Sequence, residues 1–151
     1  MSAKEVSLVK VHPGEMDFLR EYVEALYAHD EAFDSMVYIE DGVKSLLRNE
    51  VLATAYFIRS GEERVGYVIL TRYHAVDKGG LTIFIDELYV EEPARRSGVG
   101  GAVMAKITEI AQREGARALS VQAEPYNKAA HSFFAGHGFQ PNPNLNFERP
   151  L

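Results

Sequence analysis

The chain has 151 residues and a mass of 16.9 kDa, the usual size of one domain, and its 46% hydrophobic content is enough to build one core. Its formal net charge is −6, with 22 Asp and Glu against 16 Lys and Arg. That charge argues against nucleic acid and anionic membrane surfaces as partners, and it favours a neutral or cationic substrate.

The absence of cysteine narrows the chemistry further. Disulfides, thiolate zinc sites and a cysteine nucleophile are excluded, and the five histidines are too scattered to suggest a metal site. Charged residues recur through the first 20 positions and no apolar run approaches membrane-spanning length, so neither a signal peptide nor a membrane helix is expected. We therefore expect a single cytoplasmic domain over residues 1–151, without a repeat or a linker.

The first third of the chain predicts one strand and two helices. Residues 5–11 alternate imperfectly between polar and apolar side chains, as a strand with one buried face does, and Pro13 and Gly14 end it. Residues 15–29 carry apolar side chains at spacings of three and four, which predicts an amphipathic helix. Residues 30–49 are less periodic, and we expect a short helix around residues 42–49.

The middle of the chain predicts an antiparallel meander. Three strand-like runs cover residues 51–59, 64–73 and 81–90, and short connections that contain glycine separate them. Neighbouring strands joined by such short loops pair in antiparallel fashion.

The last third predicts a helix, a strand and another helix. The apolar stripe of residues 99–111 indicates a helix that ends at Gly115, residues 118–123 form a strand, and Asn127 caps a helix that ends near Gly138. A turn at residues 140–143 follows, and then a short edge strand whose length Pro150 limits. The order β-α-α-β-β-β-α-β-α-β indicates a mixed α/β or α+β fold.

The most informative stretch is residues 86–101, where a strand leads through a short loop into a helix. Gly98, Gly100 and Gly101 lie at the helix start, where free backbone N–H groups and the helix dipole bind phosphate. Arg95 and Arg96 add positive charge there. The alternative is that the glycines only permit close packing and the arginines are solvated. A Walker loop and a dinucleotide fingerprint both fit poorly, because neither complete motif is present.

This stretch resembles the GNAT N-acetyltransferases. Residues 95–100 match the family's acyl-CoA signature, which is Arg or Gln, two residues, Gly, any residue, then Gly or Ala. Residues 88–90 match its preceding strand, and residues 127–139 resemble its later motif of Asn, helix and Gly-Phe. The resemblance is close over about residues 81–140. It implies the GNAT acyl-CoA N-acyltransferase fold, a central mixed and mostly antiparallel sheet flanked by helices, and acetyl-CoA as the acyl donor.

The resemblance also implies roles for individual residues. Backbone groups of Leu88 and Val90 would hold the pantetheine arm at a splay between the fourth and fifth strands, and the amides of residues 96–101 would hold the pyrophosphate. Asn127 would meet the pantetheine, although it could serve only as a helix cap. The cofactor-binding residues implied in this way are Leu88, Tyr89, Val90, Arg95, Arg96, Ser97, Gly98, Val99, Gly100, Gly101, Asn127, Phe133 and Phe134. For the two phenylalanines, core packing is the alternative role.

Acetyl transfer to an amine needs a base, and Asp86 and Glu87 are the candidates. They are adjacent on a strand that we expect to be mostly buried, and desolvation raises the pKa of a buried carboxyl group. Neighbouring residues of a strand point to opposite faces, so only one of the two is expected to face the acceptor. The alternative role for either is substrate binding.

The general acid is less clear from the sequence. Where the family usually has a tyrosine, this chain has Phe134, which has no proton to give. Tyr126 is the substitute candidate, with His131 and Tyr89 behind it, and solvent is the alternative source of the proton.

The acceptor is expected to be the primary amine of a small molecule. The acidic and aromatic segment 27–40 favours a cation of the polyamine or aminoglycoside type, unless that segment is only a solvated surface. A protein or peptide amine, or a non-catalytic acyl-CoA-binding regulatory domain, are the alternatives. Neither nucleic acid, a membrane nor a metal is expected as a partner. Because many relatives form dimers through C-terminal strands, the resemblance implies a homodimer as one possible assembly.

Overall fold

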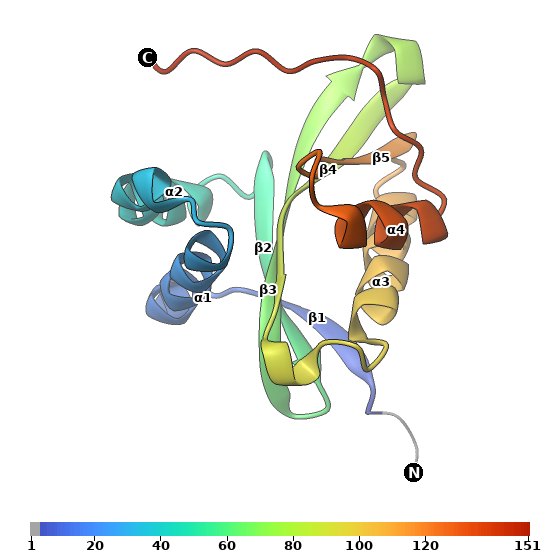
Figure 1. Cartoon of the computed structure of the whole chain (residues 1–151). Helices are drawn as coiled ribbons and strands as arrows, with labels where there is room; N and C mark the ends of the chain where they lie inside the picture. Colours follow the sequence, from blue (N-terminus) through green and yellow to red (C-terminus); the bar gives the residue numbers. More distant parts are fainter. Residues whose placement is uncertain (1–3) are drawn as a thin grey trace.

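The structure, a computed structural model, describes residues 4–151 and is built on one five-stranded sheet (Figure 1). Its strands, in spatial order, are β1 (Val6–Lys10), β2 (Ala53–Ser60), β3 (Glu63–Ala75), β4 (Gly80–Val90) and β5 (Ala118–Val121). The first four pair in antiparallel fashion, and β5 lies parallel to β4. The predicted mixed, mostly antiparallel sheet is therefore confirmed.

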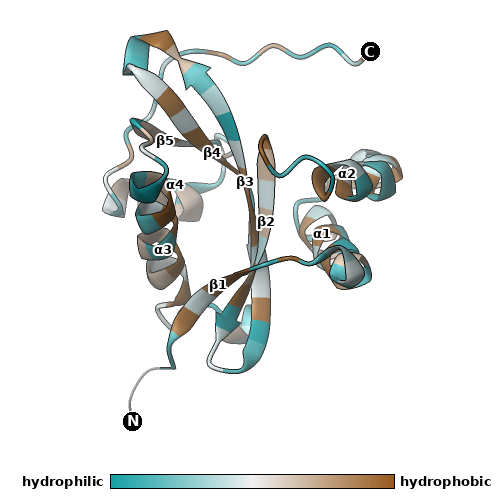
Figure 2. Ribbon diagram, turned by 180° about the vertical axis from the view of Figure 1, so that it is seen from behind, coloured by the Kyte–Doolittle hydropathy of each residue, from teal (hydrophilic) through white to brown (hydrophobic). Residues whose placement is uncertain are grey.

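Helices cover both faces of the sheet (Figures 1 and 2). Helices α1 (Met16–His29) and α2 (Ile39–Leu46) lie on one side, and α3 (Val99–Arg113) and α4 (Lys128–Gly136) lie on the other. Strand β3 is buried on both faces, since Val68 and Leu70 pack toward α3 while Tyr67 and Ile69 pack toward α1. That explains why the sequence of β3 reads as a nearly continuous apolar run. No described helix is both long and apolar enough to cross a membrane.

Most predicted elements are present, with two differences. Helix α2 begins at Ile39 rather than at residue 42, because Ile39 and Val43 both bury their side chains against the sheet. The prediction of a C-terminal edge strand is wrong, since residues 139–151 contain no strand. Pro141, Pro143 and Pro150 cannot donate backbone hydrogen bonds, so they limit the length of any strand that this segment could form.

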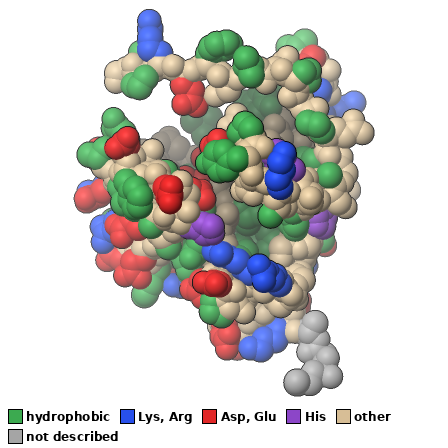
Figure 3. All heavy atoms as spheres, in the orientation of Figure 1, with side chains coloured by type: hydrophobic (Ala, Val, Ile, Leu, Met, Phe, Trp, Pro, Cys, Tyr) green, Lys and Arg blue, Asp and Glu red, His purple; other side chains and the backbone are tan. Residues whose placement is uncertain are grey.

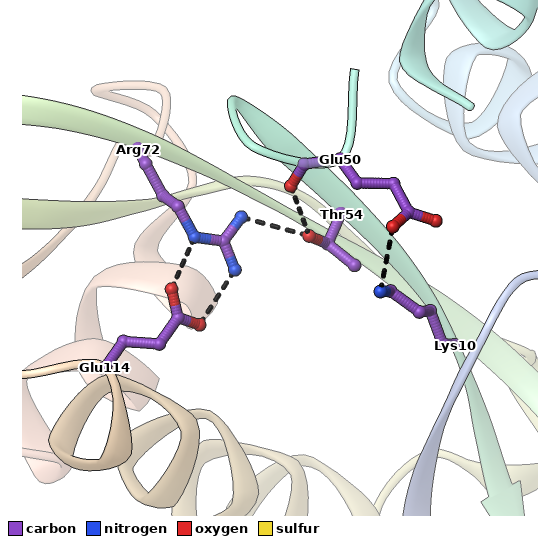
Figure 4. Close-up of polar contacts among 5 residues, drawn as sticks. All are labelled: Lys10, Glu50, Thr54, Arg72 and Glu114. Carbon is purple, nitrogen blue, oxygen red and sulfur yellow. Dashed lines mark hydrogen bonds and ion pairs between the residues drawn. The ribbon is translucent and has the colours of Figure 1, made fainter. Parts of the chain in front are cut away.

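A polar network fastens the C-terminal end of α3 to the sheet (Figure 4). Arg72 on β3 donates two hydrogen bonds to Glu114, at 2.6 and 2.8 Å, and a third to the hydroxyl of Thr54 at 3.0 Å. Thr54 donates to the backbone oxygen of Glu50, whose carboxylate pairs with Lys10 at 3.2 Å. The network therefore joins α3, β3, β2 and β1.

We expect Arg72→Met to lower the free energy of unfolding by about 1 kcal/mol at pH 7, since the pair it breaks is bidentate but partly exposed. The hydrogen bond from Arg72 lowers the pKa of Glu114. The stabilisation is therefore present above the ordinary glutamate pKa of about 4.3 and is lost as the pH falls through the folded-state pKa.

Urea denaturation at pH 7 and in steps down to about pH 3 measures this effect. Lys106→Met, which removes an exposed 3.6 Å ion pair with Glu109 elsewhere on α3, is the control and should change little. An equal loss for Arg72→Met at every pH would contradict the assigned role of the charge.

Candidate active site

Strand β4 runs on past the end of β5. Residues Thr82 to Ile85 pair with Ala118 to Val121, and β5 then ends while β4 continues to Val90. The N–H of Glu91 donates to Val65 on β3, so the backbone groups of Val90 face the opposite edge, as do those of Leu88 two residues earlier. The edge of β4 from Leu88 to Val90 therefore lies beyond the pairing with β5, where an extended ligand could add to it.

The loop that follows β4 has an unusual backbone before α3. Arg96, although not a glycine, has φ of 61°, and Gly98 has φ of 84°. Left-handed residues next to a helix start turn successive N–H groups toward one point and form an anion-binding concavity. A Cβ added at Gly98 would meet nothing within 4 Å, so the space on that side of Gly98 is open.

The glycines of this loop differ in function. A Cβ at Gly100 would come within 3.1 to 3.2 Å of the Phe133 ring, so Gly100 permits close packing of α3 against α4. Gly101 has only ordinary contact with His137, at 3.6 Å. Of the two interpretations weighed from the sequence, packing fits Gly100 and the open phosphate cradle fits Gly98.

The two arginines are placed differently. The side chain of Arg95 folds back, and its Nε donates to the Val90 oxygen at 2.6 Å while its Nη1 lies 3.3 Å from His29 Nε2. It also lies over the ring of Tyr89, 5.4 Å from the centroid. Arg96 is exposed. Arg95 therefore brings positive charge to the end of the β4 edge, but its guanidinium already has protein partners.

Glu87 is held by two tyrosines. Tyr27 on α1 donates to Glu87 Oε2 at 2.6 Å, and Tyr67 on β3 donates to Oε1 at 2.9 Å. Desolvation raises the pKa of Glu87, while these two hydrogen bonds partly oppose that shift. The outcome is a carboxylate with fixed orientation and a raised affinity for a proton.

Asp86 and Glu87 both line one pocket. In the pairing of β3 with β4, Ile69 lies opposite Glu87 and Leu70 opposite Ile85, so Asp86 is the extra residue of a β-bulge. A bulge interrupts the alternation of faces. Partial desolvation raises the pKa of Asp86, but this residue is exposed rather than mostly buried as expected, and no described residue hydrogen-bonds to its side chain.

The pocket lies between the sheet and the helices α1 and α2, and its volume is about 380 Å³. Its apolar wall includes Val23, Ile39, Val43, Leu46, Leu52 and Ile69. Figure 3 shows acidic side chains gathered over the α1 and α2 side, and Lys and Arg side chains across the lower centre, where the loop after β4 lies in Figure 1. The acidic surface over α1 and α2 suits a cationic ligand group, and the basic surface near the loop after β4 suits an anionic one.

The remaining predicted residues lie around α4. The side chain of Asn127 caps this helix, accepting from the Ala130 N–H at 3.1 Å. Phe133 and Phe134 pack edge to face, with centroids 5.4 Å apart, and only Phe133 reaches the main core. Tyr126 is 76% exposed and makes no side-chain hydrogen bond to any described residue. The structure does not bring Tyr126 into contact with Asp86 or Glu87.

Sequence reasoning missed Tyr27 and Tyr67 as partners of Glu87. They lie 60 and 20 residues away along the chain, so no local motif joins them to it. A weak signal for Tyr67 existed, because a tyrosine inside an apolar strand needs a partner for its hydroxyl.

Comparison with known proteins gives the class of this molecule. Residues 16–139 match the family model of the acetyltransferase (GNAT) family. The chain therefore belongs to the GNAT acetyltransferase family, as the signature in its loop suggested. A comparison with curated proteins found no match. Among residues 4–151, no group of three or more His, Asp or Glu side chains could hold a metal ion.

Solved structures share the fold at low identity. "A possible acetyltransferase" from Clostridium difficile 630 is 17% identical, with a TM-score of 0.83 over 98% of this chain and 99% of that one. AAC(6')-Iy, bound to the bisubstrate analogue CoA-S-monomethyl-acetylneamine, is 14% identical, with a TM-score of 0.76 over 97% and 99%. The ribosomal-protein-alanine N-acetyltransferase of Brucella melitensis biovar Abortus 2308 is 17% identical, with a TM-score of 0.74 over 95% and 98%.

We expect Gly98→Trp to weaken acetyl-CoA binding at least tenfold, about 1.4 kcal/mol, because the new side chain fills the space in front of the amides. Isothermal titration calorimetry measures this. Gly115→Trp is the matched control, since Gly115 at the other end of α3 also has a left-handed φ, 75°, and no atom near its Cβ position. Both variants carry a similar strain of about 1–2 kcal/mol. Equal affinity in the two would contradict a cradle at Gly98.

Proposed function

We propose that the chain is an acetyl-CoA-dependent N-acetyltransferase that acts on the primary amine of a small molecule, by direct attack in a ternary complex, with the cytoplasm as its location. The observation that carries the proposal is the placement of Glu87. Its carboxylate has a raised pKa and fixed orientation, lies in a pocket, and immediately precedes the open edge of β4. Family membership supports the same reaction.

For the donor, we propose that the amides of residues 96–101 hold the pyrophosphate and that the backbone of Leu88 and Val90 holds the pantetheine arm. The open space at Gly98 fits a phosphate, and the left-handed backbone on either side of Ser97 aims N–H groups toward it. AAC(6')-Iy carries a CoA-containing analogue on the same fold. Acetyl-CoA would supply the thioester carbonyl, and this chain would hold that carbonyl close to the carboxylates of Asp86 and Glu87.

For the chemistry, we propose that Glu87 removes a proton from the acceptor ammonium, directly or through water. The free amine nitrogen then attacks the thioester carbonyl carbon, the C–N bond forms, and the C–S bond breaks. The attacking nitrogen loses its second proton to solvent as the amide forms, and the departing thiolate takes a proton from solvent or from Tyr126, since Phe134 has none to give. A thiol of pKa about 8.5 leaves readily as the thiolate, so the reaction does not require a protein acid.

Two observations support an amine acceptor. Both acidic side chains that line the pocket, Asp86 and Glu87, stand at its β4 side, and no Lys or Arg lines it among the described residues. The names of AAC(6')-Iy and of the ribosomal-protein-alanine enzyme assign an aminoglycoside-type and a protein acceptor to those two proteins. A pocket of about 380 Å³ has the size of a small-molecule site, which favours the first kind of acceptor here.

Release of free thiol from acetyl-CoA in the presence of a panel of amines tests the proposal. Glu87→Gln should lower kcat/KM by about 10²- to 10⁴-fold, the usual contribution of a general base, and leave acetyl-CoA affinity unchanged. Glu91→Gln is the matched control, because Glu91 also accepts a tyrosine hydrogen bond, from Tyr22 at 2.8 Å, but lies outside the pocket.

A wild-type protein that binds acetyl-CoA but releases no thiol with any amine would instead support a non-catalytic acyl-CoA-binding domain. Full activity in Glu87→Gln would contradict the role of Glu87 as base.

We also propose a homodimer that uses the C-terminal segment. Leu145, Phe147 and Leu151 are exposed by 80% or more, and Leu145 and Phe147 alternate with polar residues as the core-facing side of a strand does. Light scattering coupled to size-exclusion chromatography should give twice the mass of 16.9 kDa. The double variant Leu145→Ser and Phe147→Ser should shift this to the monomer, and a monomeric wild type would contradict the proposal.

A further inference from the structure

The pocket beside Glu87 has a charged end and an apolar body. Its two carboxylates come from adjacent positions of β4 and therefore lie together. Val23 on α1 and Leu46 on α2 belong to the apolar lining on the helix side, whereas Ile69 on β3 lies beside Glu87. Ser45, Asn49 and Thr71 add uncharged polar side chains, and Tyr27 and Tyr38 add phenol groups. A ligand that fills this pocket would place one cationic group at β4 and an uncharged remainder against the helices.

Helix α2 forms the outer wall through one stripe of residues. Ile39, Val43 and Leu46 pack into the core and hold the helix in place. Tyr38, Gly42, Ser45 and Asn49 follow at spacings of four, three and four, so they form the adjacent stripe, and all four line the pocket. Gly42 lies in the middle of this stripe, and a Cβ added there would meet nothing within 4 Å. The absent side chain leaves room in the pocket at the cost of a weaker helix.

The acidic residues of the segment between α1 and α2 are not in this pocket. Asp30, Glu31 and Asp34 of this segment and Glu40 on α2 are exposed, and none of them is among the lining residues. The charge of Asp30 contributes to the raised pKa of Glu87, so Asp30 lies toward the β4 end of the pocket. A polycation would therefore find acidic partners for one of its ammonium groups at Asp86 and Glu87, but none in the lining for a second. This weighs against the polyamine or aminoglycoside acceptor that the acidity of residues 27–40 favours.

We propose that the acceptor is a primary amine with an apolar body, an alkyl or arylalkyl monoamine, and that Gly42 sets the length of body that the pocket admits. This inference rests on the proposed acetyl transfer. Burial of the apolar body against α2 would supply binding free energy, whereas a second ammonium group would have to lose its water without a partner.

Steady-state kinetics on a series of linear amines tests the inference. From propylamine through butylamine to hexylamine, kcat/KM of the wild type should rise about threefold to fourfold per methylene, which is the transfer free energy of one CH₂ group expressed as a rate ratio. Diaminohexane has the length of hexylamine but a charged far end. Its kcat/KM should therefore be lower than that of hexylamine by a factor of about ten or more.

Gly42→Leu is the diagnostic variant. The new side chain should abolish the advantage of hexylamine over propylamine, and acetyl-CoA affinity should stay within about twofold of the wild type. Lys44→Leu is the control, because it adds the same side chain to the same helix at a position that does not line the pocket. Lys44→Leu should retain the rise in kcat/KM from propylamine to hexylamine that the wild type shows. Circular dichroism checks that both variants fold, and Gly42→Leu should be the more stable since it removes a helical glycine.

The outcomes separate this inference from the proposed function. Equal or better turnover of diaminohexane than of hexylamine, or an unchanged series in Gly42→Leu, would overturn the inference while acetyl transfer stands. If no amine releases thiol, calorimetry of hexylamine and diaminohexane against CoA-loaded protein decides. If hexylamine binds more tightly than diaminohexane and this difference is lost in Gly42→Leu, the apolar pocket is upheld although the reaction is not. If the two amines bind equally, the inference is overturned as well.

Discussion

The carboxylate of Glu87 is kept in place by two hydrogen bonds, and the candidate site is arranged around it. A buried, unpaired carboxylate costs several kcal/mol, and hydrogen bonds to a charged group return about 1.5–3 kcal/mol each. The hydroxyls of Tyr27 and Tyr67 therefore compensate much of the cost but not all of it, which is why the pKa of Glu87 stays raised. Complete compensation would return the pKa of Glu87 to its ordinary range, and weaker compensation would raise it further.

Strand β4 joins the two halves of the proposed reaction. Its bulge at Asp86 turns two carboxylates toward the pocket under α1 and α2. The residues that follow, Leu88 and Val90, present their backbone groups to the edge that β5 does not reach, and the loop after them ends in the cradle at Gly98. In the proposed reaction, fewer than fifteen consecutive residues would place donor and acceptor against one another.

The sequence was sufficient for what local periodicity and a local motif encode. The helices, the meander and the glycine loop were predicted because each depends on neighbours along the chain. The α2 boundary was displaced because burial of Ile39 against the sheet, a tertiary contact, extends the helix toward its N-terminus. The bulge at Asp86 could not be predicted, since one extra residue in a strand leaves no mark in the apolar pattern. Tyr27 and Tyr67 required the register of β3 against β4 and the packing of α1.

The most direct test of this account is the pH dependence of kcat/KM in the wild type and in Tyr27→Phe. Because Tyr27 donates a hydrogen bond to the charged form of Glu87, its loss raises the pKa of that base further. The account predicts an acidic limb in the wild type above the ordinary glutamate pKa of about 4.3, and a shift of that limb by about one pH unit to higher pH in the variant. An acidic limb at the same pH in both proteins would show that the group that must lose its proton is not Glu87.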